Sequence, residues 1–259
     1  MFKRIGVAGV AAALVLGLAM AAWAGAALDG IKKEGTLKIA STVTGVPATF
    51  MDTKTKQVVG IMVDVGQAIA DHLGVKLEVV ETPWAALIPS LQAKKVNLIC
   101  AAMYITEERK KVVDFSQPVY PYCEALVVKA SDSKNYTSIE ELKGLKVGAQ
   151  VGTVYVKGLT ERGIADVKIY ENIGDVLMEI TNGRIDAFVG DGPVAGYLVQ
   201  TKPEFKVRMV TSYKPVMCGD IGVGVSKDDQ DLLAEVNKVV ERLKSSGKVR
   251  EILAKWGQK

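Results

Sequence analysis

The sequence alternates short apolar segments with amphipathic segments of helical period, and this alternation runs through the chain twice. The first run predicts strands at 37–42, 75–81 and 96–103 and helices at 60–74, 83–95 and 105–113. The second run predicts strands at 145–150, 167–171 and 185–190 and helices at 152–163, 173–183 and 192–200. Strands that alternate with helices favour mostly parallel sheets flanked by helices, so the chain is predicted to be α/β with two lobes.

The two runs are joined by short apolar passages near 121–124 and 217–220, which predict two crossover strands rather than a flexible tether. A strand at 221–227 and two helices at 228–247 and 249–257 follow the second passage. The predicted division is a discontinuous lobe 1, residues 25–122 plus 219–259, and a lobe 2 of residues 123–218.

The first 24 residues have the pattern of a cleaved signal peptide. Lys3 and Arg4 precede an uncharged apolar run, and Ala22-Trp23-Ala24 offers small residues at the cleavage positions. A membrane anchor is the alternative, because the run is near the length that spans a bilayer. No cysteine follows the run, which disfavours a lipid anchor. The expected location is the periplasm, reached by export.

Charge and cysteine content exclude several classes of function. The formal net charge is +4, and removal of Lys3 and Arg4 leaves 4 − 2 = +2, which gives no electrostatic reason for nucleic acid binding. The single histidine, His72, and three cysteines at positions 100, 123 and 218 suit no metal site, and no cofactor is expected. Either one cysteine pair is bridged in an oxidising compartment, or all three are small buried apolar side chains.

Three predicted strand ends carry polar groups where α/β proteins bind ligands. The first is Ala102-Met103-Tyr104, which leads to Arg109. The second is Gln150-Val151-Gly152-Thr153, followed by Val154 at the start of a helix, and the third is Gly190-Asp191-Gly192, which also opens a helix. An arginine, a helix N-terminus and an aspartate together match a zwitterion: a guanidinium and backbone N–H groups for its carboxylate, and a carboxylate for its ammonium. The alternatives are a solvated helix residue for Arg109 and helix N-caps for Thr153 and Asp191.

The segment 106–120 has the pattern T-x-x-R-x-x-x-V-x-F-S-x-P-x-Y, and the chain also contains GLKVGAQVGT, NGRIDAFVGD and IGVGVSKDD in that order. With these motifs the sequence resembles the bacterial extracellular solute-binding proteins, family 3, which serve ABC transporters. The resemblance implies a type II periplasmic binding protein fold that closes by hinge motion around a polar amino acid. It also implies a monomer that delivers its ligand to an inner-membrane permease.

The resemblance assigns Arg109 to the ligand α-carboxylate, Asp191 to the α-amino group, Gly152 and Thr153 to the second-lobe helix start, and Trp84 to an apolar wall. Three positions depart from the family pattern, one of them Met62, where the family commonly has an acidic residue. Tyr104 stands where the family has Ser or Thr, and Gly45 stands where it often has an aromatic residue, so Tyr104 or Phe50 is expected to replace that wall. If Cys123 and Cys218 lie side by side on the crossover strands, they are expected to be bridged.

Two other functions remain open from the sequence. The same fold hosts periplasmic dehydratases of the cyclohexadienyl type, which need a carboxylic acid, and the acidic candidates are Glu81, Glu124 and Glu171. No feature of the sequence distinguishes any of these three. A sensor domain that presents its ligand state to a receptor differs only in its partner. The sequence does not identify the ligand side chain.

Overall fold

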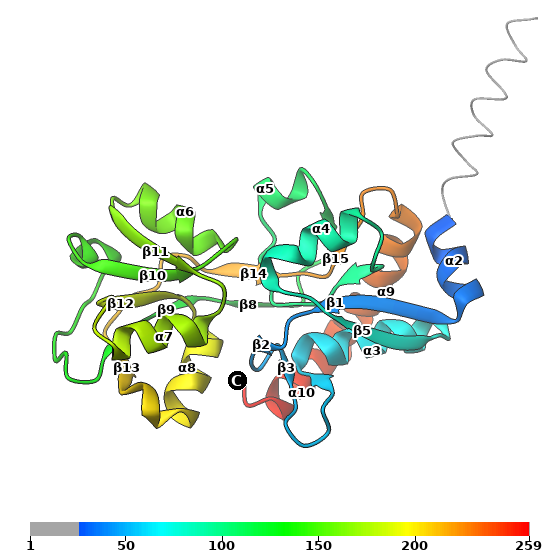
Figure 1. Cartoon of the computed structure of the whole chain (residues 1–259). Helices are drawn as coiled ribbons and strands as arrows, with labels where there is room; N and C mark the ends of the chain where they lie inside the picture. Colours follow the sequence, from blue (N-terminus) through cyan, green and yellow to red (C-terminus); the bar gives the residue numbers. More distant parts are fainter. Residues whose placement is uncertain (1–25, 259) are drawn as a thin grey trace, which may run out of the picture.

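The computed structural model describes residues 26–258 and contains two five-stranded sheets side by side (Figure 1). The first sheet has the order β5 (Lys76–Glu81), β1 (Thr36–Ser41), β6 (Leu98–Ile99), β15 (Gly224–Val225), β7 (Asp114–Phe115). The second has the order β11 (Asp166–Tyr170), β10 (Lys146–Gln150), β12 (Ala187–Asp191), β9 (Glu124–Lys129), β13 (Val207–Met209). We call the parts built around these sheets lobe 1 and lobe 2.

The two sheets share one topology. β1 pairs in parallel with β5 and β6, whereas β15 is antiparallel to β6 and β7. In lobe 2, β10 pairs in parallel with β11 and β12, whereas β9 is antiparallel to β12 and β13. One strand in each sheet, β15 or β9, therefore runs against the other four. The predicted α/β fold with two lobes and mostly parallel sheets is confirmed.

The reversed strand in each sheet is the one that follows a crossover between the lobes. β8 (Tyr120–Tyr122) leads into β9, and β14 (Gly219–Ile221) leads back toward β15. β8 and β14 pair antiparallel, with Gly219 opposite Tyr122 and Ile221 opposite Tyr120. This two-stranded connection, which we call the hinge, lies between the lobes in Figure 1.

Helices cover the sheets of both lobes. Lobe 1 carries α2 (Ala26–Glu34), α3 (Ile61–Leu73), η1 (Trp84–Ala86), α4 (Leu87–Gln92), α5 (Glu107–Lys110), α9 (Gln230–Ser245) and α10 (Lys248–Lys255). It also has a small sheet of β2 (Thr44–Gly45), β3 (Thr49–Met51) and β4 (Val58–Val59). Lobe 2 carries η2 (Ile139–Leu142), α6 (Val154–Glu161), α7 (Ile173–Thr181), α8 (Gly192–Thr201) and η3 (Pro203–Phe205).

The core of each lobe forms where a helix packs on its sheet. Leu37 and Ile39 on β1 are fully buried, as is Ile69 on α3, which ends at the left-handed Gly74. In lobe 2 the fully buried Phe188 on β12 belongs to a cluster with Leu177 of α7. Burying side chains of this size stabilises each lobe by roughly 1.5–3 kcal/mol per residue.

Three predicted elements are shorter in the structure. The strand predicted at 96–103 pairs only at β6, because the chain leaves the sheet after Ile99 to form the cleft wall and a bridge between Tyr104 and Ile221. The helix predicted at 105–113 is the single turn α5, because Val113 is buried and the chain then enters β7. The helix predicted at 83–95 divides into η1 and α4.

The predicted signal peptide, residues 1–24, lies outside the described residues. Within residues 26–258, no helix has the length and hydropathy needed to cross a membrane. The described residues also contain no group of three or more His, Cys, Asp or Glu side chains arranged to hold a metal ion.

Candidate functional site

A pocket with about 560 Å³ of space, part of it open to solvent, lies between the lobes at the hinge. Lobe 1 contributes side chains from β2, β3, η1, α5 and the loops after β1 and β6, and lobe 2 contributes side chains from β10, α6, α7, β12 and α8. The lining residues are Thr42, Thr44, Gly45, Thr49, Trp84, Ala102, Tyr104, Arg109, Tyr122, Gln150, Thr153, Val154, Tyr155, Ile173, Asp191 and Val194.

Arg109 reaches this pocket from α5. Its backbone N–H donates to the Thr106 hydroxyl at 3.1 Å, which caps the helix and fixes where the side chain starts. One guanidinium nitrogen donates to the Tyr104 carbonyl at 2.9 Å, and the other donates across the cleft to the Gly152 carbonyl at 3.2 Å. The guanidinium carbon lies 5.7 Å from the centre of the Trp84 ring. Burial lowers the pKa of Arg109, but arginine keeps its charge in proteins.

Asp191 reaches the pocket from the end of β12, where it is also the N-cap of α8. Its Oδ1 atom accepts a hydrogen bond from the Val194 N–H at 3.1 Å. Burial raises the pKa of Asp191 to about 6, and the polar Tyr122 hydroxyl and the hydrogen bond from the Val194 N–H oppose this rise. The predicted N-cap and the predicted ligand group are thus the same side chain in two compatible roles.

Arg109 and Asp191 come from different lobes and line the same pocket. Within residues 26–258, neither has an oppositely charged side chain within 4.0 Å. Charges withdrawn from water are costly unless they are paired, so both groups gain from a ligand of the opposite sign. A small molecule with a carboxylate and an ammonium offers one partner to each.

The N-terminus of α6 provides further donors. Thr153 precedes the helix, and its hydroxyl donates to the Gln150 carbonyl at 2.7 Å instead of capping a helical N–H. The first N–H groups of a helix have no intrahelical acceptor, so those from Val154 onward are available to an anion. Gly152, with φ +69°, does not line the pocket described above, where it was expected. It lines a second groove beside that pocket, whose lining includes Glu108 and Lys157 and which we call the outer groove; the first pocket is then the inner pocket. The Gly152 carbonyl instead accepts the hydrogen bond from Arg109.

The structure places the residues predicted for the aromatic wall differently from one another. Trp84 lines the pocket, as does the predicted site residue Ala102. Phe50 does not, because side chains alternate along β3 and its neighbour Thr49 faces the pocket. The Phe50 ring instead packs edge-on against Trp256 of the C-terminal segment, with ring centres 5.4 Å apart.

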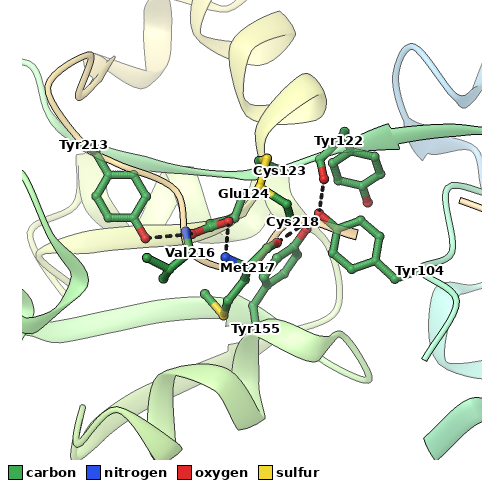
Figure 2. Close-up of a disulfide and its surroundings, with 9 residues drawn as sticks. All are labelled: Tyr104, Tyr122, Cys123, Glu124, Tyr155, Tyr213, Val216, Met217 and Cys218. Atoms are coloured by element: carbon green, nitrogen blue, oxygen red, sulfur yellow. Dashed lines mark hydrogen bonds between the residues drawn. A yellow bond between two sulfur atoms is a disulfide. The ribbon is translucent and has the colours of Figure 1, made fainter. Parts of the chain in front are cut away.

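Tyr104 lines the pocket with its ring, while its hydroxyl is engaged in the hinge (Figure 2). The hydroxyl lies 3.0 Å from the Tyr122 carbonyl and 3.2 Å from the Met217 carbonyl, both acceptors for its proton. It also accepts a hydrogen bond from the Tyr155 hydroxyl at 3.2 Å. The Tyr104 hydroxyl is therefore part of the hinge and is not free to contact a ligand.

Next to this network, the structure contains a disulfide between Cys123 and Cys218, at the lobe 2 end of β8 and β14 (Figure 2). Glu124 is buried beside it and accepts hydrogen bonds from the Tyr213 hydroxyl and from the Val216 and Met217 N–H groups, at 2.7–2.9 Å. The two crossover segments are thus tied together on the lobe 2 side.

The carboxyl groups considered for a dehydratase lie elsewhere. Glu124 is occupied by the three donors of the hinge, and Glu81 and Glu171 are exposed; none of the three lines the pocket. Among the described residues that line the pocket, Asp191 is the one acidic residue.

Sequence reasoning missed several lining residues. Thr42 follows the carboxyl end of β1, so the strand-end rule could have found it. Gln150, which the sequence places at a polar strand end, lines the pocket at the end of β10. Thr44 and Thr49 belong to the small β2–β3 hairpin, which gave no sequence signal. The others missed are Tyr122, Tyr155, Ile173 and Val194.

Comparison with known proteins agrees with this geometry. The chain is 30% identical over 251 residues to the L-cystine-binding protein TcyJ of Escherichia coli (strain K12), covering 95% of this chain and 92% of that one. It is 31% identical to the lysine/arginine/ornithine-binding periplasmic protein of the same organism, with 95% of each chain covered. A crystal structure of a mutant ArgBP from T. maritima superposes with a TM-score of 0.82 at 34% identity, covering 89% of this chain and 98% of that chain.

The family models give the same assignment. Residues 37–259, which include both lobes and the hinge, match the model of one family. The chain belongs to the bacterial extracellular solute-binding proteins, family 3.

Proposed function

We propose that this chain is the amino acid-binding component of an ABC transporter. It takes up a free amino acid in the periplasm, closes around it and delivers it to a membrane permease. The single observation that supports this most strongly is the placement of Arg109 from lobe 1 and Asp191 from lobe 2 on one pocket, each without a charged partner among the described residues. The names of the relatives, which refer to amino acids, point the same way.

In this proposal Arg109 binds the ligand α-carboxylate together with the N–H groups at the start of α6. Asp191 binds the α-ammonium. The carboxylate then contacts both lobes, because the Arg109 guanidinium already lies at the Gly152 carbonyl. A ligand that contacts both lobes binds the closed form better than the open form, and this difference in affinity drives closure.

Lobe 1, with residues 25–122 and 219–259, and lobe 2, with residues 123–218, move as two bodies about β8 and β14. The Cys123–Cys218 disulfide and the Glu124 contacts hold the lobe 2 ends of the crossovers together. The protein works as a monomer, and the predicted signal peptide directs its export.

The chain is a solute-binding protein and not an enzyme, in agreement with its family and with the names of its relatives. Its ligand is released unchanged. The pocket accordingly needs groups that hold a ligand, and the hinge needs to open again for release to the permease.

The test is titration calorimetry on protein stripped of bound ligand by unfolding and refolding, with a panel of amino acids. Removing one partner of a buried charge pair costs about 2–5 kcal/mol, so Arg109→Gln is expected to weaken binding at least about 30-fold. Arg250→Gln is the matched control, because Arg250 is exposed on α10 and does not line the pocket. Binding that survives Arg109→Gln unchanged would remove the proposed clamp.

A further inference from the structure

The charge content of the pocket limits the side chain of the ligand. Of residues 26–258, those that line the pocket include two charged ones, Arg109 and Asp191, and no others. In the proposed function both are used by the two charged groups that every amino acid carries. A ligand side chain with its own charge would therefore enter the closed pocket without a counter-charge, which is costly.

Two acidic residues near the cleft, Glu108 and Glu171, do not add a negative charge to the pocket lining. Glu108 lies on the outer groove, where it is ion-paired with Lys157 of lobe 2 at 3.2 Å. Glu171 is exposed, and it is its backbone carbonyl that accepts a hydrogen bond from the Gln150 amide. Neither carboxylate faces the inner pocket, so neither can neutralise a cationic side chain there.

The lobe 1 wall of the pocket carries hydroxyl groups instead. Thr42 and Thr49 are buried, and their hydroxyl oxygens lie 2.7 Å apart. One proton of the two hydroxyls forms this hydrogen bond, which leaves the second proton and further lone pairs available. Thr44, at the exposed rim, adds a third hydroxyl. We call Thr42, Thr44 and Thr49 the threonine wall.

Gly45 keeps the threonine wall accessible. A Cβ atom at this position would lie 3.0 Å from the Thr42 hydroxyl oxygen and 3.4 Å from that of Thr49. Any side chain here would cover the hydroxyl pair. Across the pocket, Gln150 uses its amide nitrogen on the Glu171 carbonyl, and its own carbonyl oxygen is left to accept from a ligand.

We propose, on the basis of the function proposed above, that the threonine wall around Gly45 is the side-chain subsite and that the ligand is an amino acid with an uncharged, hydrogen-bonding side chain. Amide and hydroxyl side chains both donate and accept, as the hydroxyl pair does. The relative named for lysine, arginine and ornithine carries a name for cationic ligands; this chain discriminates against them.

The first experiment compares ligands that differ only in charge, using titration calorimetry on the stripped full-length mature protein. The pairs are citrulline with arginine and glutamine with glutamate, which are close in shape. The neutral member of at least one pair is expected to bind at least 30-fold more tightly than its charged counterpart. If, in the pair that binds more tightly, the charged ligand bound as tightly as its neutral counterpart, the inference would be overturned while the proposed function stayed intact.

Absence of binding by all amino acids, including alanine and serine, would overturn the proposed function itself.

The second experiment tests whether the threonine wall is the side-chain subsite. Thr42→Val and Thr49→Val keep the shape of the side chain and remove its hydroxyl. Each variant is expected to bind the preferred neutral ligand about 10-fold more weakly than the parent does. The affinity for alanine, whose side chain is too short to reach the threonine wall, is expected to change less than 2-fold. An equal loss of affinity for both ligands would show that the hydroxyls do not bind the ligand side chain.

The third experiment uses a variant that is expected to gain affinity for a charged ligand, so its result cannot be attributed to a damaged pocket. Thr44→Asp places a carboxylate at the exposed rim of the wall, where solvent tolerates its charge. It is expected to raise the affinity for arginine relative to citrulline at least 10-fold. The matched control is Thr160→Asp on the exposed surface of α6, which is expected to leave the ratio unchanged. An unchanged ratio in Thr44→Asp would place the side-chain subsite elsewhere and refute the assignment.

Discussion

Asp191 makes the ligand-free protein less stable than it could be, and this can be measured with Asp191→Asn. Burial raises the pKa of Asp191 from 3.8 to about 6. A difference of about 2.2 pKa units corresponds to about 3 kcal/mol at a pH well above 6. Asparagine caps a helix as well as aspartate does, so the Val194 contact of α8 is retained. The variant is therefore expected to be more stable than the parent by about 3 kcal/mol at pH 7.5.

The sign follows from which form the fold disfavours. Because the pKa is higher in the folded state, the ionised carboxylate is destabilising there, and the protonated form carries no penalty. The destabilisation by Asp191 is absent below about pH 3.8, where the group is protonated in both states, and it is fully developed once the pH has risen through about 6. The advantage of Asp191→Asn is thus expected to shrink from about 3 kcal/mol at pH 7.5 to about 1.6 kcal/mol at pH 5.

The assay is urea unfolding of ligand-free protein between pH 5 and 8, with the free energy extrapolated to zero urea. Asp114→Asn is the control of opposite sign. Burial raises the pKa of Asp114, but the hydrogen bonds it accepts from Lys227 and Gln230, together with the Lys227 charge, outweigh this and lower the pKa. Loss of the Asp114 charge is therefore expected to reduce stability. The reasoning is refuted if Asp191→Asn gives no gain at pH 7.5 or a gain that does not depend on pH.

The remaining predictions concern binding, the hinge and a tight turn. Affinity for a zwitterion is expected to fall below about pH 6, because protonated Asp191 no longer attracts an ammonium; a flat calorimetric profile from pH 5 to 7.5 would contradict this. Glu124→Gln places an amide against three donors and is expected to cost about 1–3 kcal/mol in urea unfolding. Reducing the Cys123–Cys218 disulfide, which spans 95 residues, is expected to cost at most about 4.7 kcal/mol, measured against a double serine variant. Gly60→Ala would place a Cβ 2.4 Å from the carbonyl oxygen of residue 48 and is expected to lower Tm by at least several degrees.

The sequence by itself determined the α/β class and most of the elements. Apolar residues at helical spacing predicted α3, and the structure places it at Ile61–Leu73, ending at a glycine. Ser138 and Glu141 have the three-residue spacing of a capping box, and in the structure that box opens η2, with the Ser138 N–H donating to the Glu141 carboxylate. The segment 106–120 identified the family. These features follow from residues close together in the chain, whose spacing fixes the local backbone regardless of what packs against it.

The tertiary structure alone decided how those elements serve the pocket. The hydroxyl of Tyr104 turns to the Met217 carbonyl, 113 residues away, instead of to the ligand. Glu124 was a candidate acid in the sequence, but its carboxylate accepts hydrogen bonds from backbone N–H groups 92 and 93 residues further along the chain. The threonine wall exists because the β2–β3 hairpin turns Thr49 toward Thr42 and Phe50 away. Contacts of this kind join distant segments, and local periodicity carries no information about which distant group a side chain will meet.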